Sequence, residues 1–203
     1  MKEKTGKERA FISWVKSKCK QHGVECSLRN VKYLKLSGNI KCSGYFDDGG
    51  DKHPKLVVAM NRADWLGILV HEYCHLTQWA EGHELWEKAG KSLACVEDWL
   101  SGSSVRNISH HLANARDLEL DNEKRSVNLM RKWNLDIDID DYTKRANAYI
   151  QFYNYLRTTR RWSKPTNSPY TNSNLLLAMS NKFNMNYKKM SKKVEKAFIN
   201  ENI

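Results

Sequence analysis

Residues 55–80 read KLVVAMNRADWLGILVHEYCHLTQWA, and this stretch predicts the centre of the fold. Its first six residues form a short apolar run between Pro54 and Asn61, which is typical of a buried strand. Asp64 is of a residue type that begins helices, and Gly82 is of a type that ends them. We therefore expect a buried strand that is followed by a helix from Asp64 to just before Gly82.

The predicted helix contains His-Glu-Tyr-Cys-His at residues 71–75, which is the HExxH motif. Because side chains four residues apart lie on one face of a helix, His71 and His75 can bind one metal ion together. Glu72 is displaced around the helix by one residue, so its carboxylate can reach a metal-activated water but not the metal itself. The motif therefore predicts a Zn2+ site with Glu72 as the general base of a hydrolysis.

Two histidines and a glutamate can also fall at this spacing by accident. However, Trp65, Leu69, Leu76 and Trp79 give the same helix an apolar stripe, which predicts that the helix is buried. Burial of two histidines and a glutamate costs free energy unless these groups are paired or bind a metal. The surroundings of the motif therefore favour a metal site.

A catalytic zinc site normally has three protein ligands, so HExxH leaves one ligand to be found. Glu81 lies six residues after His75, at the offset of the third ligand in metzincins. Gln78 and Glu81, however, stand where that pattern has a glycine and a histidine. Three further alternatives are His83, which follows the predicted helix end, and His110 and His111, which lie early on a later predicted helix.

Glu119 is the better candidate for the third ligand. Glu119 and Glu123 share one face of a predicted helix, where like charges repel by roughly 0.2–0.5 kcal/mol. A nearby cation, or a histidine ligand to orient, turns this repulsion into stabilisation. The alternative is a solvated acidic face, with Arg116, Lys124 and Arg125 as ion-pair partners.

An HExxH motif that is followed on a later helix by Glu-x-x-x-acid resembles the gluzincin metallopeptidases. The chain is similar to minimal gluzincins of the ImmA/IrrE type, to the CAAX prenyl peptidase group and to small metallopeptidase-like proteins of tailed phages. The resemblance covers roughly residues 31–130 and implies a zinc metalloendopeptidase. It implies that Glu119 ligates Zn2+ and that Glu123 supports a ligating histidine. Glu123 departs from the commoner Asp or Asn, and Ser126 from the usual Ala.

The periodicity of the whole chain predicts an α+β fold. We expect an N-terminal helix and a short three-stranded sheet, packed on the HExxH helix and followed by a mostly helical C-terminal half. The expected helices span residues 8–21, 64–80, 84–100, 105–133 and 140–162, with short basic helices at residues 175–179 and 188–199. The expected strands span residues 31–36, 40–46 and 55–60, with a turn at Ser37-Gly38-Asn39.

The 203 residues fit one domain with ordinary tails. We expect a zincin-like metallopeptidase domain at residues 1–163 and a basic C-terminal extension at residues 164–203. The five cysteines include no CxxC pair, and the N-terminus has no apolar segment of the kind found in secretory signals. No apolar run is long enough to span a bilayer. These features predict a cytoplasmic protein without a membrane partner.

The net charge of +11 is unevenly distributed, because residues 142–203 contain twelve Lys and Arg against two acidic residues. Such a segment predicts weak, sequence-independent binding to nucleic acid or another polyanion. A solvated basic surface without a dedicated partner has the same composition. The residues expected to contact a polyanion are Arg157, Arg160, Arg161, Lys188, Lys189, Lys192 and Lys193.

Two classes of function remain open. As a peptidase, the chain would hold a protein or peptide substrate as an added strand along residues 40–46 or 55–60, and the ImmA-type resemblance implies a repressor as substrate. The alternative is a zinc-stabilised nucleic-acid-binding or regulatory module that uses the basic C-terminal segment. SprT-like proteases combine both features, although with a third histidine ligand. Glu72 favours the peptidase, since a purely structural zinc site needs no base.

Overall fold

The structure is a computed structural model, and it describes residues 5–36, 41–50 and 52–203. The described residues confirm the expected α+β class. The chain forms two compact units that alternate along the sequence: unit 1 is made of residues 1–83 and 125–137, and unit 2 is made of residues 84–124 and 138–203. The helix α4 (Ile108–Trp133) contributes residues to both units.

Unit 1 contains a three-stranded sheet in the order β1-β5-β4. The central strand β5 (Lys55–Ala59) is the predicted apolar run, and its side chains from Leu56 to Ala59 are buried. β5 pairs in parallel with β1 (Glu25–Arg29) and antiparallel with β4 (Gly44–Asp47). Because the side chains of β5 are buried on both faces of the sheet, the strand is a continuous apolar run and not an alternation of apolar and polar residues.

The predicted strand at residues 31–36 was placed too late in the sequence. The strand that pairs with β5 is β1, and only Leu34–Lys35 (β2) of the predicted range form a strand. The reason is that β1 reads ECSLR, whose middle side chains are only half-buried. Hydrophobic alternation therefore gives little signal there.

The predicted strand at residues 40–46 divides at Ser43 into two short strands. β3 (Lys41–Cys42) pairs with β2, whereas β4 joins the main sheet. Ser43 itself bends the chain between them, and its carbonyl accepts a hydrogen bond from the Ala59 amide at 2.9 Å. The predicted turn at residues 37–39, and Ile40, lie outside the described residues.

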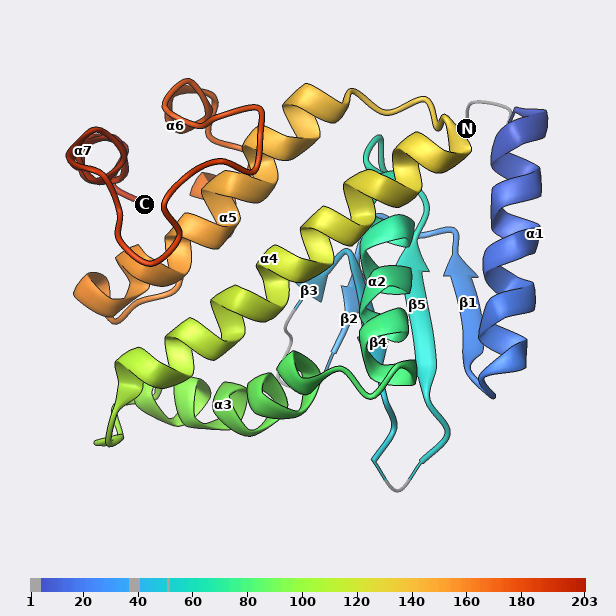
Figure 1. The fold of residues 1–203 in the computed structure, drawn as a ribbon, viewed down its shortest axis with the longest axis horizontal. Coiled ribbons are helices and arrows are strands. Elements are labelled where there is room, and N and C mark those ends of the chain that lie inside the picture. Colours follow the sequence, from blue (N-terminus) through green and yellow to red (C-terminus); the bar gives the residue numbers. More distant parts are fainter. Residues whose placement is uncertain (1–4, 37–40, 51) are drawn as a thin grey trace. The chain divides into compact units, whose positions relative to one another are not determined.

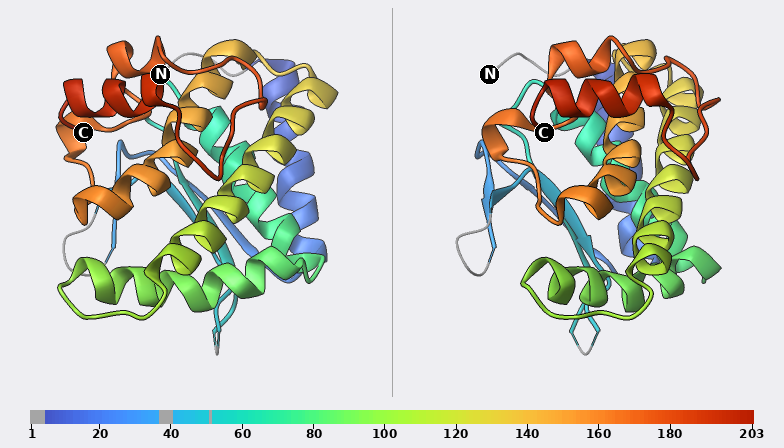
Figure 2. Two further views of the ribbon diagram at one scale, coloured as in Figure 1. Left: turned by 60° about the vertical axis from the view of Figure 1, so that its left-hand side comes forward. Right: turned by 90° about the vertical axis from the view of Figure 1, so that its left-hand side faces the viewer.

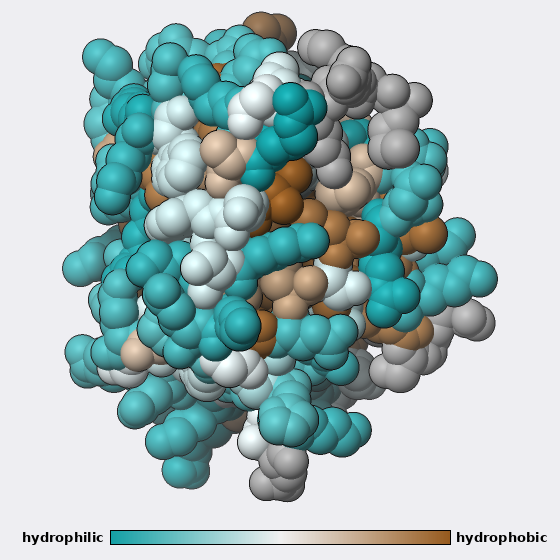
Figure 3. Space-filling model, turned by 90° about the vertical axis from the view of Figure 1, so that its right-hand side faces the viewer, coloured by the Kyte–Doolittle hydropathy of each residue, from teal (hydrophilic) through white to brown (hydrophobic). Residues whose placement is uncertain are grey.

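Two helices cover the sheet of unit 1 (Figure 1). α1 (Gly6–Gln21) begins two residues earlier than predicted, because Thr5 and Glu8 form a capping box. α2 (Trp65–Ala80) packs on β4 and β5 and ends before Gly82, whose φ is +61°. The face of the molecule on the side where α1 lies in Figure 1 is mostly hydrophilic, with hydrophobic side chains gathered in its middle (Figure 3).

An aromatic cluster joins α1 to the last turn of α4 within unit 1. The ring centroid of Trp133 lies 5.3 Å from that of Phe11 and 5.3 Å from that of Trp14. Trp14 also contacts Tyr73 of α2, at 5.0 Å. The C-terminal part of α4 is thereby fixed in unit 1 by apolar contacts.

Unit 2 is helical and contains α3 (Glu84–Leu100), the first part of α4, α5 (Ile139–Thr159), the short 3-10 helix η2 (Pro165–Asn167), α6 (Ser173–Leu176) and α7 (Lys192–Asn200). α6 and α7 lie beside α5 (Figure 2). The predicted boundary at residue 163 lies inside this unit, because its core includes side chains from both sides of that position. The C-terminal contributors to the core are Leu175, Leu176, Met179, Val194, Phe198 and Ile203.

Within the described part of the chain, no helix is both long and apolar enough to cross a membrane.

Candidate metal centre

α2 places the two histidines of the HExxH motif next to each other. His71 is half-buried and His75 is 9% exposed, and their ring centroids are 4.7 Å apart with the ring planes nearly perpendicular. The helix around them is apolar, since Leu69 and Leu76 are fully buried. The helical spacing thus brings two imidazoles together, one half-buried and one buried, as the sequence predicts.

Gln78 holds the ring of His75. The Oε1 atom of Gln78 lies 2.9 Å from Nδ1 of His75, and the Gln78 side chain is fully buried. When Nδ1 carries the proton and donates to this oxygen, the other ring nitrogen, Nε2, has its lone pair available for a metal. In the sequence alone, Gln78 stood out only as a mismatch to the metzincin pattern. The signal for its role was the spacing of three residues from His75, which puts both side chains on one helix face.

Glu119 lies on α4 between two anchored arginines. In unit 2, Arg116 donates a hydrogen bond to the Asn154 side chain of α5 at 3.0 Å. In unit 1, Arg125 donates to Glu81 at 2.7 Å, at the end of α2. Because the helix is continuous from Arg116 to Arg125, the direction of the Glu119 side chain follows from the helical geometry.

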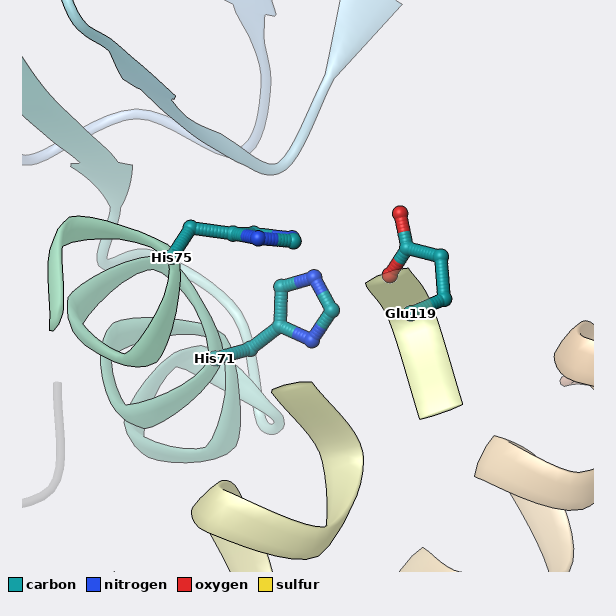
Figure 4. A group of neighbouring side chains, drawn as sticks. All are labelled: His71, His75 and Glu119. Carbon is teal, nitrogen blue, oxygen red and sulfur yellow. The ribbon is translucent and has the colours of Figure 1, made fainter. Parts of the chain in front are cut away.

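His71, His75 and Glu119 form the group of potential metal ligands among the described residues. One ligand atom from each residue lies within 4.8 Å of the other two, and the side chains point toward one another (Figure 4). Two imidazoles and a carboxylate are the donor set of His₂Glu zinc sites. The residues present therefore fit a zinc ion.

Two tyrosines of α5 lie near Glu119 without adding negative charge. The hydroxyl oxygens of Tyr149 and Tyr153 are 3.1 Å apart. Burial is the main cause that raises the pKa of each hydroxyl, and the Glu119 carboxylate raises both pKa values further. Both tyrosines therefore stay neutral at physiological pH and leave Glu119 as the anionic group for a cation.

The general base predicted by the motif, Glu72, is only 8% exposed. The thiol of Cys42 lies close to it: burial raises the pKa of Cys42, and the neighbouring Glu72 carboxylate raises it further. Glu123, the predicted support for a histidine ligand, is 6% exposed and lies one helical turn after Glu119. Its supporting role stays a prediction.

The alternative third ligands lie outside the group. The Glu81 carboxylate forms an ion pair with Arg125. Nε2 of His110 lies 3.2 Å from the Asn114 amide, and Nδ1 of His111 lies 3.2 Å from the Ser92 hydroxyl, so these histidines contact α3 and α4. These three residues and His83 are absent from the ligand group formed by the described residues.

Comparisons with models of protein families, with curated proteins and with solved structures gave no match to this chain. The resemblance to gluzincins therefore rests on the residue pattern at 71–75 and 119–123 and stays a prediction.

The geometry predicts one zinc ion per chain, and His71→Ala should abolish stoichiometric binding because two remaining ligands hold zinc weakly. Elemental analysis of the purified variant measures this. His83→Ala is the matched control and should keep a full equivalent. A full equivalent of zinc in His71→Ala would contradict the site.

In an anomalous-scattering map of the zinc-loaded protein, a Glu119 oxygen should lie about 2.0–2.2 Å from the metal.

Gln78→Leu should lower the zinc affinity about 10–100-fold, because the ring of His75 loses the acceptor that orients it. Competition against a chelating dye measures the affinity. Gln78→Glu keeps an acceptor at the same place and should restore most of it. If Gln78→Leu bound zinc as tightly as the unchanged chain, Gln78 would be a packing residue only.

Proposed function

We propose that the chain is a zinc-dependent endopeptidase of the gluzincin kind, with His71, His75 and Glu119 as metal ligands. The convergence of their ligand atoms within 4.8 Å is the observation that supports the proposal most directly. A buried glutamate directly after the first histidine favours hydrolysis over a structural zinc site, because a structural site has no use for a base.

In this proposal Glu72 performs the proton transfers. Its carboxylate accepts a proton from the attacking water and delivers it to the nitrogen of the leaving amine. Zinc, when bound, supplies a Lewis acid that polarises the substrate carbonyl and lowers the pKa of water toward about 7. The low exposure of Glu72 limits the water around its carboxylate, which strengthens its interaction with charged groups nearby.

The sheet topology favours one of the two predicted substrate strands. β5 is central and has a neighbour on each side, so residues 55–60 offer no edge. β4 has β5 as its one partner among the described strands and packs on α2. Since Ser43 is hydrogen-bonded to Ala59, the antiparallel alternation directs the main-chain groups of Gly44 and Phe46 away from β5. We propose that an extended peptide pairs with these groups.

A second candidate function is polyanion binding by the C-terminal segment. Arg157, Arg161 and the four lysines 188, 189, 192 and 193 are exposed. Arg160 differs from them, since its guanidinium donates to the carbonyls of Trp99 at 2.8 Å and Ser103 at 2.7 Å. Arg160 therefore stabilises unit 2, and the lysines are the better residues to test.

Glu72→Gln should keep one zinc ion and lower the hydrolysis of fluorescein-labelled casein about 10²–10⁴-fold, because the amide cannot accept the proton. Zinc content and rate are measured on the same preparation. Glu97→Gln, an exposed change on α3, is the control and should leave both unchanged. Near-normal hydrolysis by Glu72→Gln would end the proposed mechanism.

For polyanion binding, removal of the C-terminal segment is a poor test, because that segment supplies core side chains of unit 2. We expect instead that changing lysines 188, 189, 192 and 193 to Gln weakens binding to a labelled oligonucleotide. The slope of log K against log salt concentration should become shallower by roughly 0.9 for each phosphate that the lysines no longer neutralise.

The matched control changes four exposed lysines of unit 1, Lys20, Lys35, Lys41 and Lys52, and so removes the same charge. It should bind the oligonucleotide almost as well as the unchanged chain. Equal binding by both variants, or no binding at low salt, would leave the basic segment as a solvated surface.

A further inference from the structure

Gly44, the first residue of β4, lies directly against the side chain of Glu72. A Cβ atom built on Gly44 would lie 3.1 Å from Cγ and 3.2 Å from Oε1 of Glu72. It would also lie 2.6 Å from Cγ2 of Ile68, one helical turn earlier on α2. The missing side chain at this position therefore leaves the space into which α2 places the carboxylate.

The reason for a glycine here is space and not backbone conformation. Glycines with positive φ occur elsewhere in the described chain, for example Gly49 and Gly82, but Gly44 is not among them. Its backbone conformation is that of an ordinary strand, which any residue can adopt. A β-branched or other residue with good strand propensity would suit the strand better, so proximity to α2 is what requires a glycine.

The backbone of β4 has little freedom to move away from Glu72. Gly44 is paired with Val58 of the central strand, which is fully buried, and the preceding carbonyl, that of Ser43, accepts a hydrogen bond from Ala59. Two residues later, Phe46 packs against Trp79 of α2 with ring centroids 5.6 Å apart. An added methyl group would therefore displace side chains before it displaced the strand.

The two side chains in contact respond differently to such a methyl group. Ile68 is β-branched and on a helix, so its χ1 angle is stiff. Glu72 is unbranched and has flexible χ angles, so its carboxylate is the group that moves most readily. A displacement of about 1 Å at a reacting group can lower a rate about 100-fold.

We infer that Gly44 is a positioning residue for the general base: the absence of a side chain at residue 44 fixes the place of the Glu72 carboxylate between β4 and α2. This inference rests on the proposed function, in which Glu72 transfers the proton. It adds that β4, the strand proposed to hold the substrate, also sets the position of the base. The positions of the bound peptide and of the Glu72 carboxylate are then both determined by β4.

Gly44→Ala tests the inference. The zinc-loaded variant should keep one equivalent of zinc and a nearly unchanged KM for fluorescein-labelled casein, while kcat falls about 10-fold, because the displacement is smaller than the roughly 1 Å that costs about 100-fold. A crystal structure of the variant should show the Glu72 carboxylate displaced by a few tenths of an ångström or more. Gly90→Ala is the matched control, since a Cβ there meets nothing within 4 Å, and it should leave kcat unchanged.

Loss of folding is separated from displacement of the base by Ile68→Ala, alone and combined with Gly44→Ala. The double variant lacks the shortest clash but keeps the contact with Glu72, so its kcat should stay below that of Ile68→Ala alone. Equal kcat in this pair, or an unmoved carboxylate in Gly44→Ala, would overturn the inference. An unchanged chain that binds no zinc and cleaves no casein would overturn the proposed function instead, and the carboxylate position in the crystal would still decide the role of Gly44.

Discussion

The placement of two imidazoles one helical turn apart on a buried helix is the constraint on which the rest of the site depends. α2 is apolar enough to pack on the sheet, with Leu69 and Leu76 fully buried, yet it also buries Glu72 and His75 and leaves His71 half-buried. Polar groups in such a place cost free energy unless they find partners. The buried amide of Gln78 provides one such partner for His75, and a metal ion bound by both rings would offset much of the remaining cost.

The continuity of α4 is the second requirement of the site. Its last turn is held by aromatic contacts of Trp133, its middle by the ion pair of Arg125 with Glu81, and its first half by the hydrogen bond of Arg116 to Asn154. Glu119 lies on a continuous helix and not on a loop, so the helical geometry sets the direction of its side chain. Sites built on such elements hold their ligands with less variation than sites built on loops.

The sequence predicted those parts of the molecule whose periodicity or motif is strong. HExxH, the helix that contains it and the strand at residues 55–59 followed from local pattern alone. The choice of Glu119 among five alternatives could not follow from spacing, because helical periodicity does not tell which later helix comes near. The roles assigned to Gln78 and Gly44 depend on neighbours in space, which local pattern does not reveal.

Two parts of the fold were also beyond local pattern. The strand β1 was missed because its half-buried side chains show no alternation. In the C-terminal segment the lysines suggested an extension, whereas Val194 and Phe198, four residues apart on α7, are both buried in the core of unit 2.

Neither unit is a continuous piece of the chain, so the first segment of each unit must wait for a later segment before that unit is complete. Unit 1 becomes complete only when residues 125–137 return to it after the whole of residues 84–124. The entropy of closing that loop must be lost before the aromatic cluster around Trp133 can form. Since α4 passes from one unit into the other without a break, melting of either unit frays a helix that the other needs. The two units are therefore coupled in unfolding, unlike a pair of independent domains joined by a linker.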